Sequence, residues 1–310
     1  MERIAVIMSV YNGRRYLAEQ IDSVLGQTYK NIDIFIHDDG SQDGSVEIIN
    51  EYANKYENVH YIKDATGQGY PKCFIYLLEK VSGYDFYAFC DQDDVWKKDK
   101  IENGIVCLNK SDQAFPLLYY TAVDYCDERL NYIRGSRFAK GKTVIEQMSL
   151  QMMMFGGEAM GMTFVFNDVA RVALLKANTN EESYKDWFLK VYCAACGKVY
   201  YNPISSAFYR RHEAAVTNGS NPSGRLKRYW RQFREVFFSE NGFNEQKRIF
   251  NYLLHNEKSK IDHDDIKLLE LFSMPNTMGK RIKKFWWQRR YRSRILDEIG
   301  YRFAFLLGRI

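Results

Sequence analysis

The chain has 310 residues, of which 46% are hydrophobic and 27% are charged. This composition excludes a disordered or low-complexity chain, and the length fits one large domain or one domain with an appendage. No run of about 18 apolar residues is present, so no membrane-spanning helix is expected. The first apolar run is too short for a secretory signal peptide, and the six scattered cysteines predict reduced thiols in a cytoplasmic protein.

The net charge of +5 conceals a division of the chain into two parts. Residues 1–221 hold 24 Lys and Arg against 29 Asp and Glu, whereas residues 222–310 hold 20 against 10. An acidic body therefore carries a basic tail.

The N-terminal third alternates between apolar runs and segments with helical spacing. Strands are predicted at residues 4–10, 32–37, 59–62 and 84–89, with helices at 14–27, at 43–55 and around 74–78. This alternation predicts an α/β fold with a mostly parallel central sheet flanked by helices.

Polar residues follow these strands at Asn12, at Asp38-Asp39 and at Asp91-Gln92-Asp93-Asp94. Because the carboxyl ends of parallel strands meet at one edge of a sheet, these groups are expected to converge where ligands bind. Carboxylates are the ligands that hard divalent ions prefer, often together with substrate phosphates. The alternative is a solvated acidic turn that caps a helix starting near Trp96.

Two common nucleotide motifs are missing from the sequence. The absence of GxGxxG after the first strand disfavours a dinucleotide fold, and the absence of GxxxxGK[ST] excludes a P-loop. The remaining interpretation is a nucleotide held by side-chain carboxylates and a metal ion.

Four segments together resemble the inverting family-2 glycosyltransferases with a GT-A fold, a nucleotide-sugar-binding architecture. They are Val6–Gly13, Ser23–Tyr29, Asp38–Ser45 and Asp91–Asp94, and the resemblance runs from residue 3 to about residue 215. Three further segments are similar to the rhamnosyltransferase-type subgroup of bacterial surface polysaccharide synthesis, namely Cys90–Trp96, Lys185–Trp187 and Tyr209–His212. The resemblance implies a GT-A catalytic domain at residues 1–221 and an α-helical extension at 222–310.

The resemblance implies a site for Mn²⁺ or Mg²⁺ at the acidic cluster. Asp93 would ligate the metal, Asp91 would contact the metal or the ribose, and Asp94 would lie nearby or cap a helix. His212 would ligate the metal or touch the diphosphate, although a lone His is more often structural.

The resemblance also assigns residues to the nucleotide. Asp39 would accept a hydrogen bond from the pyrimidine N3–H, and Asp38 would do the same or hold the loop. Tyr11 would border the base. Gly69 and Lys72 are placed to reach the phosphates, and an exposed surface lysine is the alternative for Lys72.

Asp186 matches the catalytic base of the family, and Trp187 beside it is a candidate substrate contact. The alternative for Asp186 is an acidic residue favoured by the helix dipole at a helix start. The subgroup usually has His before this Asp, and this chain has Lys185, a cation that would lower the pKa of Asp186 or pair with a phosphate. This difference from the subgroup puts the identity of the sugar or of the acceptor in doubt more than the type of reaction.

The basic tail contains aromatic and basic residues at helical spacing in 225–238 and 280–309, with an apolar stripe at Trp287, Tyr291, Ile295, Ile299, Phe303 and Leu306. Such helices are typical of peripheral membrane contact, here at the inner face of the cell membrane. The alternatives are packing on the catalytic domain or on a second copy of the chain. No nucleic-acid motif accompanies the charge.

The sequence therefore predicts an inverting, metal-dependent glycosyltransferase that acts on a growing polysaccharide or a polyprenyl-linked acceptor. The leading donor is dTDP-rhamnose, from which L-rhamnose would be transferred, and a UDP-hexose is the alternative. A non-catalytic scaffold that binds nucleotide sugar is a rival of another class. Nucleotidyl transfer is disfavoured, because no Gly-rich phosphate loop follows the first strand.

Overall fold

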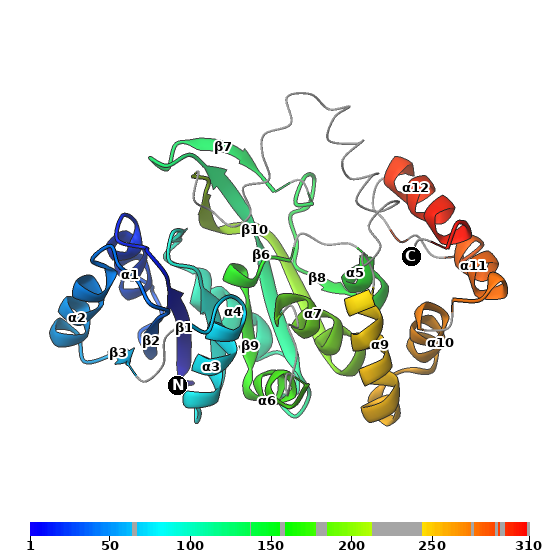
Figure 1. The fold of residues 1–310 in the computed structure, drawn as a ribbon, viewed down its shortest axis with the longest axis horizontal. Coiled ribbons are helices and arrows are strands. Elements are labelled where there is room, and N and C mark those ends of the chain that lie inside the picture. The colour runs from blue at the N-terminus through cyan, green and yellow to red at the C-terminus, as the bar shows by residue number, and fades with distance from the viewer. Residues whose placement is uncertain are drawn as a thin grey trace. The chain divides into compact units, whose positions relative to one another are not determined.

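The computed structural model describes residues 1–63, 67–136, 138–155, 159–177, 185–212, 244–273, 276–288, 291 and 295–308. These residues form two compact units, which are described separately (Figure 1). Unit 1 comprises residues 1–148, 158–193 and 197–212, and unit 2 comprises 149–157, 194–196 and 213–310. The boundary predicted at residue 221 and the helix predicted at 225–238 lie outside the described residues.

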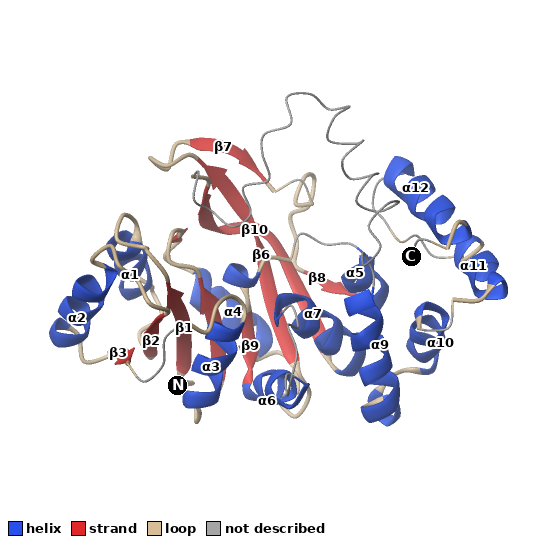
Figure 2. Cartoon of the chain, in the orientation of Figure 1, coloured by secondary structure: helices blue, strands red, loops and turns tan. Residues whose placement is uncertain are grey.

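Unit 1 begins with parallel strands that alternate with helices, as predicted (Figure 2). The strands are β1 (Ile4–Val10), β2 (Ile32–Asp38), β3 (Val59–Ile62) and β4 (Phe86–Cys90). The helices between them are α1 (Leu17–Leu25), α2 (Ser45–Lys55) and α3 (Lys72–Lys80). The order in the sheet is β3-β2-β1-β4, which places β1 between β2 and β4.

The centre of this sheet is fully enclosed. Val6 of β1 lies opposite Ile34 of β2 and Ala88 of β4, and all three have no exposed surface. Strands buried on both faces are apolar along their whole length, which explains the unbroken run that begins at Ile4. Each fully buried aliphatic side chain of this size contributes about 1.5–3 kcal/mol.

The rest of the sheet combines parallel and antiparallel strands. Its elements are β5 (Val95–Trp96), α4 (Lys100–Leu108), β6 (Leu117–Cys126), β7 (Tyr132–Gly135), β8 (Glu146–Met148), the 3₁₀ turn η1 (Gly161–Thr163), β9 (Val165–Asn167), α6 (Asp168–Ala177), α7 (Lys185–Cys196) and β10 (Lys198–Arg210). Strand β9 lies antiparallel between β4 and β6, and β10 runs parallel to β6. The predicted α/β fold with a mostly parallel sheet is confirmed.

The alternative interpretation of the acidic cluster, a turn that caps a helix near Trp96, is wrong. The segment after the acidic cluster forms β5 instead of a helix, and α4 begins only at Lys100. Val95 and Trp96 pair with Phe208 and Ala207 of β10, so a partner far away in the sequence decides the conformation. Asp94 therefore does not cap a helix near Trp96.

Unit 2 is helical among its described residues. Its elements are α5 (Leu150–Phe155), α9 (Asn244–Asn256), the 3₁₀ turn η2 (Lys258–Lys260), α10 (His263–Phe272), α11 (Met278–Phe285) and α12 (Ile295–Leu306). An aromatic cluster forms its core, with ring centroids 4.7–6.1 Å apart, from Phe155, Phe272, Tyr291 and Phe305. No described helix is both long and apolar enough to cross a bilayer.

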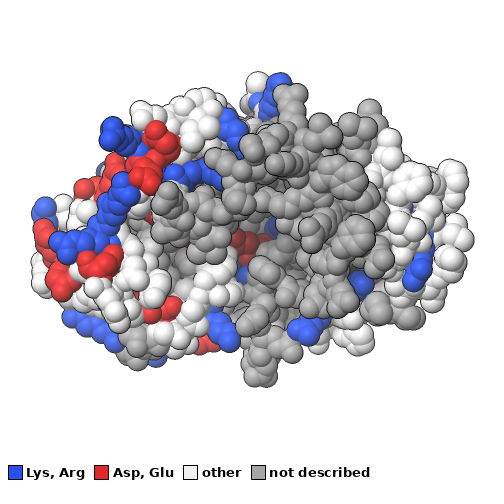
Figure 3. All heavy atoms as spheres, turned by 45° about the horizontal axis from the view of Figure 1, so that its top comes forward, with Lys and Arg blue, Asp and Glu red and all other residues white. Residues whose placement is uncertain are grey.

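The tail stripe predicted from Trp287 to Leu306 is only partly present. The helix is interrupted between α11 and α12, Tyr291 is fully buried, and the indole of Trp287 donates a hydrogen bond to Gln151 Oε1 at 3.2 Å. On the face drawn in Figure 3, the α11–α12 end shows Lys and Arg among uncharged residues. The predicted basic character remains, but some members of the stripe belong to the core.

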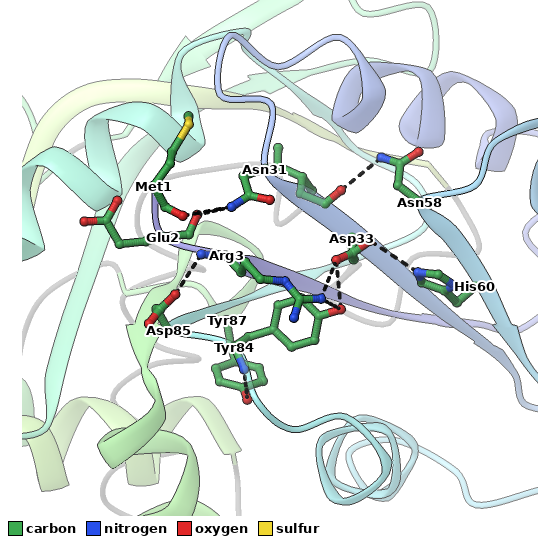
Figure 4. A network of polar contacts seen from close by, with 11 residues as sticks. Met1, Glu2, Arg3, Asn31, Asp33, Asn58, His60, Tyr84, Asp85 and Tyr87 are labelled. Carbon is green, nitrogen blue, oxygen red and sulfur yellow. Dashed lines mark hydrogen bonds and ion pairs between the residues drawn. The ribbon is translucent and has the colours of Figure 1, made fainter.

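A polar network joins the amino ends of the strands of unit 1 (Figure 4). The Arg3 guanidinium donates to Asp33 at 3.2 Å and to the Tyr84 hydroxyl at 2.9 Å, and the Arg3 N–H donates to Asp85. His60 Nε2 lies 3.3 Å from Asp33. These contacts link the starts of β1, β2, β3 and β4, and they leave the opposite, carboxyl edge of the sheet for ligands.

Candidate active site

The loop after β1, which begins at Tyr11, is hydrogen-bonded to the acidic loop after β4, residues 91–94. The Tyr11 N–H donates to Gln92 Oε1 at 2.8 Å, and Gln92 Nε2 donates back to the Tyr11 carbonyl at 2.9 Å. The Tyr11 side chain is 60% exposed, so its ring is accessible. A β-carbon at Gly13 would collide with the Gln92 side chain, which explains the glycine. Sequence reasoning missed Gln92, because its partner lies 81 residues away.

The two aspartates after β2 have different contacts. Asp38 is buried and accepts hydrogen bonds from the Gly40 and Ser41 N–H groups at 3.0 and 2.9 Å, so it holds the loop. Asp39 accepts from the N–H groups of Gln68 and Gly69 at 2.6 and 2.8 Å. The structure therefore brings Asp39 and Gly69 together. Lys72 is exposed at the first turn of α3.

The acidic loop contains three carboxylates in distinct surroundings. Asp93 lies with its Oδ2 2.7 Å from His212 Nε2, although 119 residues separate the two. Asp94 is buried and accepts from the Arg210 N–H at 2.9 Å. Burial, followed by Asp93 and Asp91, raises the pKa of Asp94 well above its usual value. Asp94 is thus a structural contact between the loop and β10.

Asp91 lies where negative charge accumulates. Burial raises its pKa to about 7; Lys185 opposes this effect, and the charges of Asp93 and Asp186 add to it. The pKa of a carboxylate rises when it is desolvated among other carboxylates. A divalent cation would supply the missing positive charge.

Arg210 holds the acidic loop, residues 91–94, in place. Its guanidinium is almost fully buried and donates to the carbonyls of Asp93 at 2.8 Å and Glu128 at 2.6 Å, and to the Glu19 carboxylate. The guanidinium also lies over the Tyr16 ring, 4.4 Å from its centroid. In the sequence, Arg210 was recognised only as part of the segment Tyr209–His212. Its role in holding the acidic loop was missed.

Asp186 opens α7 and is held on two sides. Its Oδ1 accepts from the Lys185 ammonium at 2.8 Å, and its Oδ2 accepts from the Gly161 N–H of η1 at 3.0 Å. The Asp186 side chain is 27% exposed, whereas that of Lys185 is 2% exposed. Trp187 is half-buried beside it. The carboxylate can therefore still be reached by a substrate hydroxyl.

The residues predicted to hold a metal fit that role in part. Among the described residues, no three His, Cys, Asp or Glu side chains converge as a ready-made metal centre. The Asp93–His212 pair and the Asp91 carboxylate nonetheless offer oxygen and nitrogen donors on one loop and the adjacent strand end. Ions of the Mg²⁺ type complete such a set with substrate phosphates and water.

Polar loops thus gather at the carboxyl edge of an α/β sheet. The family model described as "Glycosyl transferase family 2" matches residues 5–169. Because this match covers more than half of the chain, the protein belongs to glycosyl transferase family 2, and the predicted family is confirmed.

Relatives among known proteins are named as glycosyltransferases or as a particular kind of glycosyltransferase. The chain is 28% identical to the dTDP-rhamnosyl transferase RfbG of Shigella flexneri over 220 residues, which cover 66% of this chain and 72% of that protein. It is 33% identical to an uncharacterized glycosyltransferase of Rickettsia typhi over 150 residues, or 47% of this chain. The match spans only 46% of the Rickettsia protein.

Solved structures share the fold. The S. aureus TarS 1–349 complex with UDP-GlcNAc has a TM-score of 0.56 at 17% identity, and the match covers 99% of this chain and 92% of that one. GalNAc-T7 with UDP, GalNAc and Mn²⁺ has a TM-score of 0.52 at 15% identity, with 87% of this chain and 54% of that chain covered. These likenesses confirm the GT-A architecture.

Proposed function

We propose that this glycosyltransferase is metal-dependent and inverting, and that it transfers L-rhamnose from dTDP-rhamnose to a glycan or polyprenyl-linked acceptor in the synthesis of a bacterial surface polysaccharide such as capsule or cell wall. The observation that carries the proposal is the gathering of carboxylates at one sheet edge, where Asp39 follows β2, Asp93 follows β4, and the charge of Asp186 acts on Asp91. The similarity to a dTDP-rhamnosyl transferase supports rhamnose as the donor sugar.

The donor would lie across the loops after β1, β2 and β4. In this proposal the Tyr11 ring borders the base, Asp39 accepts from the pyrimidine N3–H, and the Gly69 and Lys72 segment faces the phosphates. Asp91, Asp93 and His212 would hold Mn²⁺ or Mg²⁺. When bound, such an ion acts as a Lewis acid that stabilises charge on the departing diphosphate.

Asp186 is the proposed catalytic base. The acceptor hydroxyl oxygen attacks the anomeric carbon, and the bond from that carbon to the diphosphate oxygen breaks. The hydroxyl proton passes to the Asp186 carboxylate, and attack opposite the leaving group inverts the anomeric centre. Trp187 would line the acceptor side. The partial exposure of Asp186 supports the proposal, because a general base must reach its proton within hydrogen-bonding distance.

The test is sugar transfer by Asp186→Asn, which keeps the shape of the side chain. Wild-type protein is incubated with dTDP-rhamnose or UDP-hexoses and a membrane extract as acceptor, and nucleotide release and glycan product are measured. We expect turnover to fall by roughly 100- to 10,000-fold in the variant, with dTDP binding retained. Near-normal turnover in the variant would disprove the base assignment.

The donor comparison also separates the alternatives. Transfer from a UDP-hexose alone would keep the enzyme and replace the donor, an alternative supported by the fold shared with the TarS complex containing UDP-GlcNAc. Nucleotide binding without transfer from any donor would favour a non-catalytic scaffold.

Contact with the inner face of the cell membrane is part of the proposal. Two apolar stripes at i, i+4 spacing are exposed on unit 2, at Met278, Ile282 and Trp286 of α11 and its end, and at Ile299, Phe303 and Leu307 of α12 and its end. The stripes are adjacent, since the Phe285 and Phe303 rings lie 5.7 Å apart. The exposed Lys283 adds positive charge beside them, which suits anionic lipid.

Sedimentation with phosphatidylglycerol vesicles tests this contact. The double variant Trp286→Ser, Phe303→Ser is expected to stay in the supernatant under conditions in which wild type sediments. Tyr132→Ser is the matched control, because Tyr132 is a similarly exposed aromatic residue of unit 1. Equal sedimentation of all three proteins would reject the lipid surface. Self-association of the wild type that the double variant abolishes would identify a second copy of the chain as the partner instead.

A further inference from the structure

Lys185 is a buried cation, and apolar packing alone does not explain why a charged group is buried there. Its side chain is 2% exposed, although a lysine of this kind is rarely buried without a partner. Burial alone would lower its pKa, but Asp186, Tyr70 and Asp91 outweigh burial, so that the pKa is raised. Lys185 therefore carries its charge in an almost closed environment.

Aromatic rings surround the ammonium group. The Lys185 Nζ lies 4.2 Å from the ring centroid of Phe74, 4.5 Å from that of Phe89 and 5.1 Å from that of Tyr70. Ring faces attract a cation, most strongly where water is excluded. Three rings on α3, on β4 and before α3 thus fix the position of one ammonium group.

The fixed ammonium group contacts Asp186, and a second group contacts the other carboxylate oxygen. Lys185 donates to Oδ1 at 2.8 Å, and the Gly161 N–H donates to Oδ2 at 3.0 Å. Each carboxylate oxygen accepts more than one hydrogen bond, so both remain able to accept from a substrate hydroxyl. A carboxylate held through both oxygens has little rotational freedom.

The contact between the Gly161 N–H and Asp186 leaves no room for a side chain at residue 161. A β-carbon at this position would collide with the Asp186 carboxyl atoms. The Gly161 backbone does not lie in the left-handed region, so alanine is tolerated by the chain itself. An added methyl group would thus displace the Asp186 carboxylate first.

We propose that Lys185 and the Gly161 N–H form a clamp that positions the Asp186 carboxylate for proton transfer. Lys185 is thus a positioning residue. The inference rests on the proposed function, in which Asp186 is the base. It explains why a lysine precedes Asp186, since its ammonium group contacts the adjacent carboxylate.

The test compares Lys185→Met, Gly161→Ala and Asp186→Asn in the transfer assay, using the donor that supports wild-type turnover. We expect kcat to fall roughly 100-fold in the first two variants, the size that misplacement of a catalytic group by about 1 Å causes. The KM for the donor should change far less than kcat. Lys284→Met is the matched control, because Lys284 is a buried lysine of unit 2 whose ammonium lies 4.7 Å from the Phe272 ring centroid. Its kcat should match wild type.

The outcomes separate the two proposals. Wild-type kcat in Lys185→Met and Gly161→Ala, with Asp186→Asn inactive, would overturn the clamp and keep the base. Turnover by Asp186→Asn would overturn the base itself. A purely structural role for Lys185 predicts a lower thermal midpoint with unchanged kcat per folded molecule, which would also overturn the clamp. If Lys185→Met fails to fold, the kcat of Gly161→Ala decides the question.

Discussion

Replacing Arg210 by Met should destabilise unit 1 and loosen the acidic loop. The Arg210 side chain is 3% exposed and donates to the carbonyls of Asp93 and Glu128 and to the carboxylate of Glu19. Methionine fills much of the same volume but donates no hydrogen bond.

The magnitude follows from what the substitution leaves behind. A fully buried acceptor that loses its donor costs about 1–3 kcal/mol. In Arg210→Met, the partly buried backbone carbonyls of Asp93 and Glu128 lose their donors. Glu19, with 51% of its side chain exposed, regains water, so its share is small. We expect a loss of about 2–4 kcal/mol, because the two carbonyls are only partly buried. The thermal midpoint of unit 1 should fall by roughly 10 °C.

Urea unfolding followed by tryptophan fluorescence measures the loss. Arg210→Lys should lie between wild type and Arg210→Met, since a lysine keeps the charge but lacks the planar fork. Lys97→Met is the control, because the Lys97–Asp124 ion pair is partly exposed, with 31% of the lysine side chain accessible. It should cost about 0–1 kcal/mol. A loss in Arg210→Met no larger than in Lys97→Met would refute the reasoning.

Three further predictions concern other groups. His212→Ala should weaken Mn²⁺ affinity by roughly 10- to 100-fold in calorimetric titration with dTDP present, and unchanged affinity would remove His212 from the metal site. Asp39→Ala should weaken dTDP binding by roughly 10-fold, since one hydrogen bond to a charged acceptor is lost, and equal dTDP affinity in variant and wild type would contradict the contact with the base. Burial, followed by Lys247, Lys280 and Arg281, lowers the pKa of Lys284 from 10.5 to about 7. The unfolded chain then binds more protons between these values, so the stability of unit 2 should rise from pH 7 toward pH 10. Lys284→Met should remove this rise, and an identical pH slope in both proteins would contradict the shift.

The first half of the sheet could be predicted because its signals are local. Apolar runs that alternate with helical spacing place β1 to β4, and the edge where their loops meet follows from parallel pairing. Parallel pairing of these strands brings Asp39 and Asp93 to one edge of the sheet. Strand β5 could not be predicted in the same way, because Trp96 takes its conformation from Ala207, far along the chain.

The contacts that hold the candidate site were beyond local reasoning for the same reason. The Gly161 N–H and Asp186 are 25 residues apart, and Gln92 meets Tyr11 across 81 residues. Neither pair has a spacing that marks it in a single sequence. In the tail, a local pattern was misleading. Helical spacing placed Tyr291 on an exposed stripe, whereas packing against Phe155 and Phe305 buries it.

The proposed metal-dependent nucleotide site is tested most directly by thermal stability with and without metal. Wild type and Asp93→Asn are heated with dTDP, UDP, GDP or CMP, each with Mn²⁺, Mg²⁺ or a chelator. A ligand that binds only the folded protein raises the midpoint by mass action. We predict that dTDP raises the wild-type midpoint only when the metal is present, and that Asp93→Asn loses this response. An equal rise in the chelator, or no rise with any nucleotide, would contradict the proposed site.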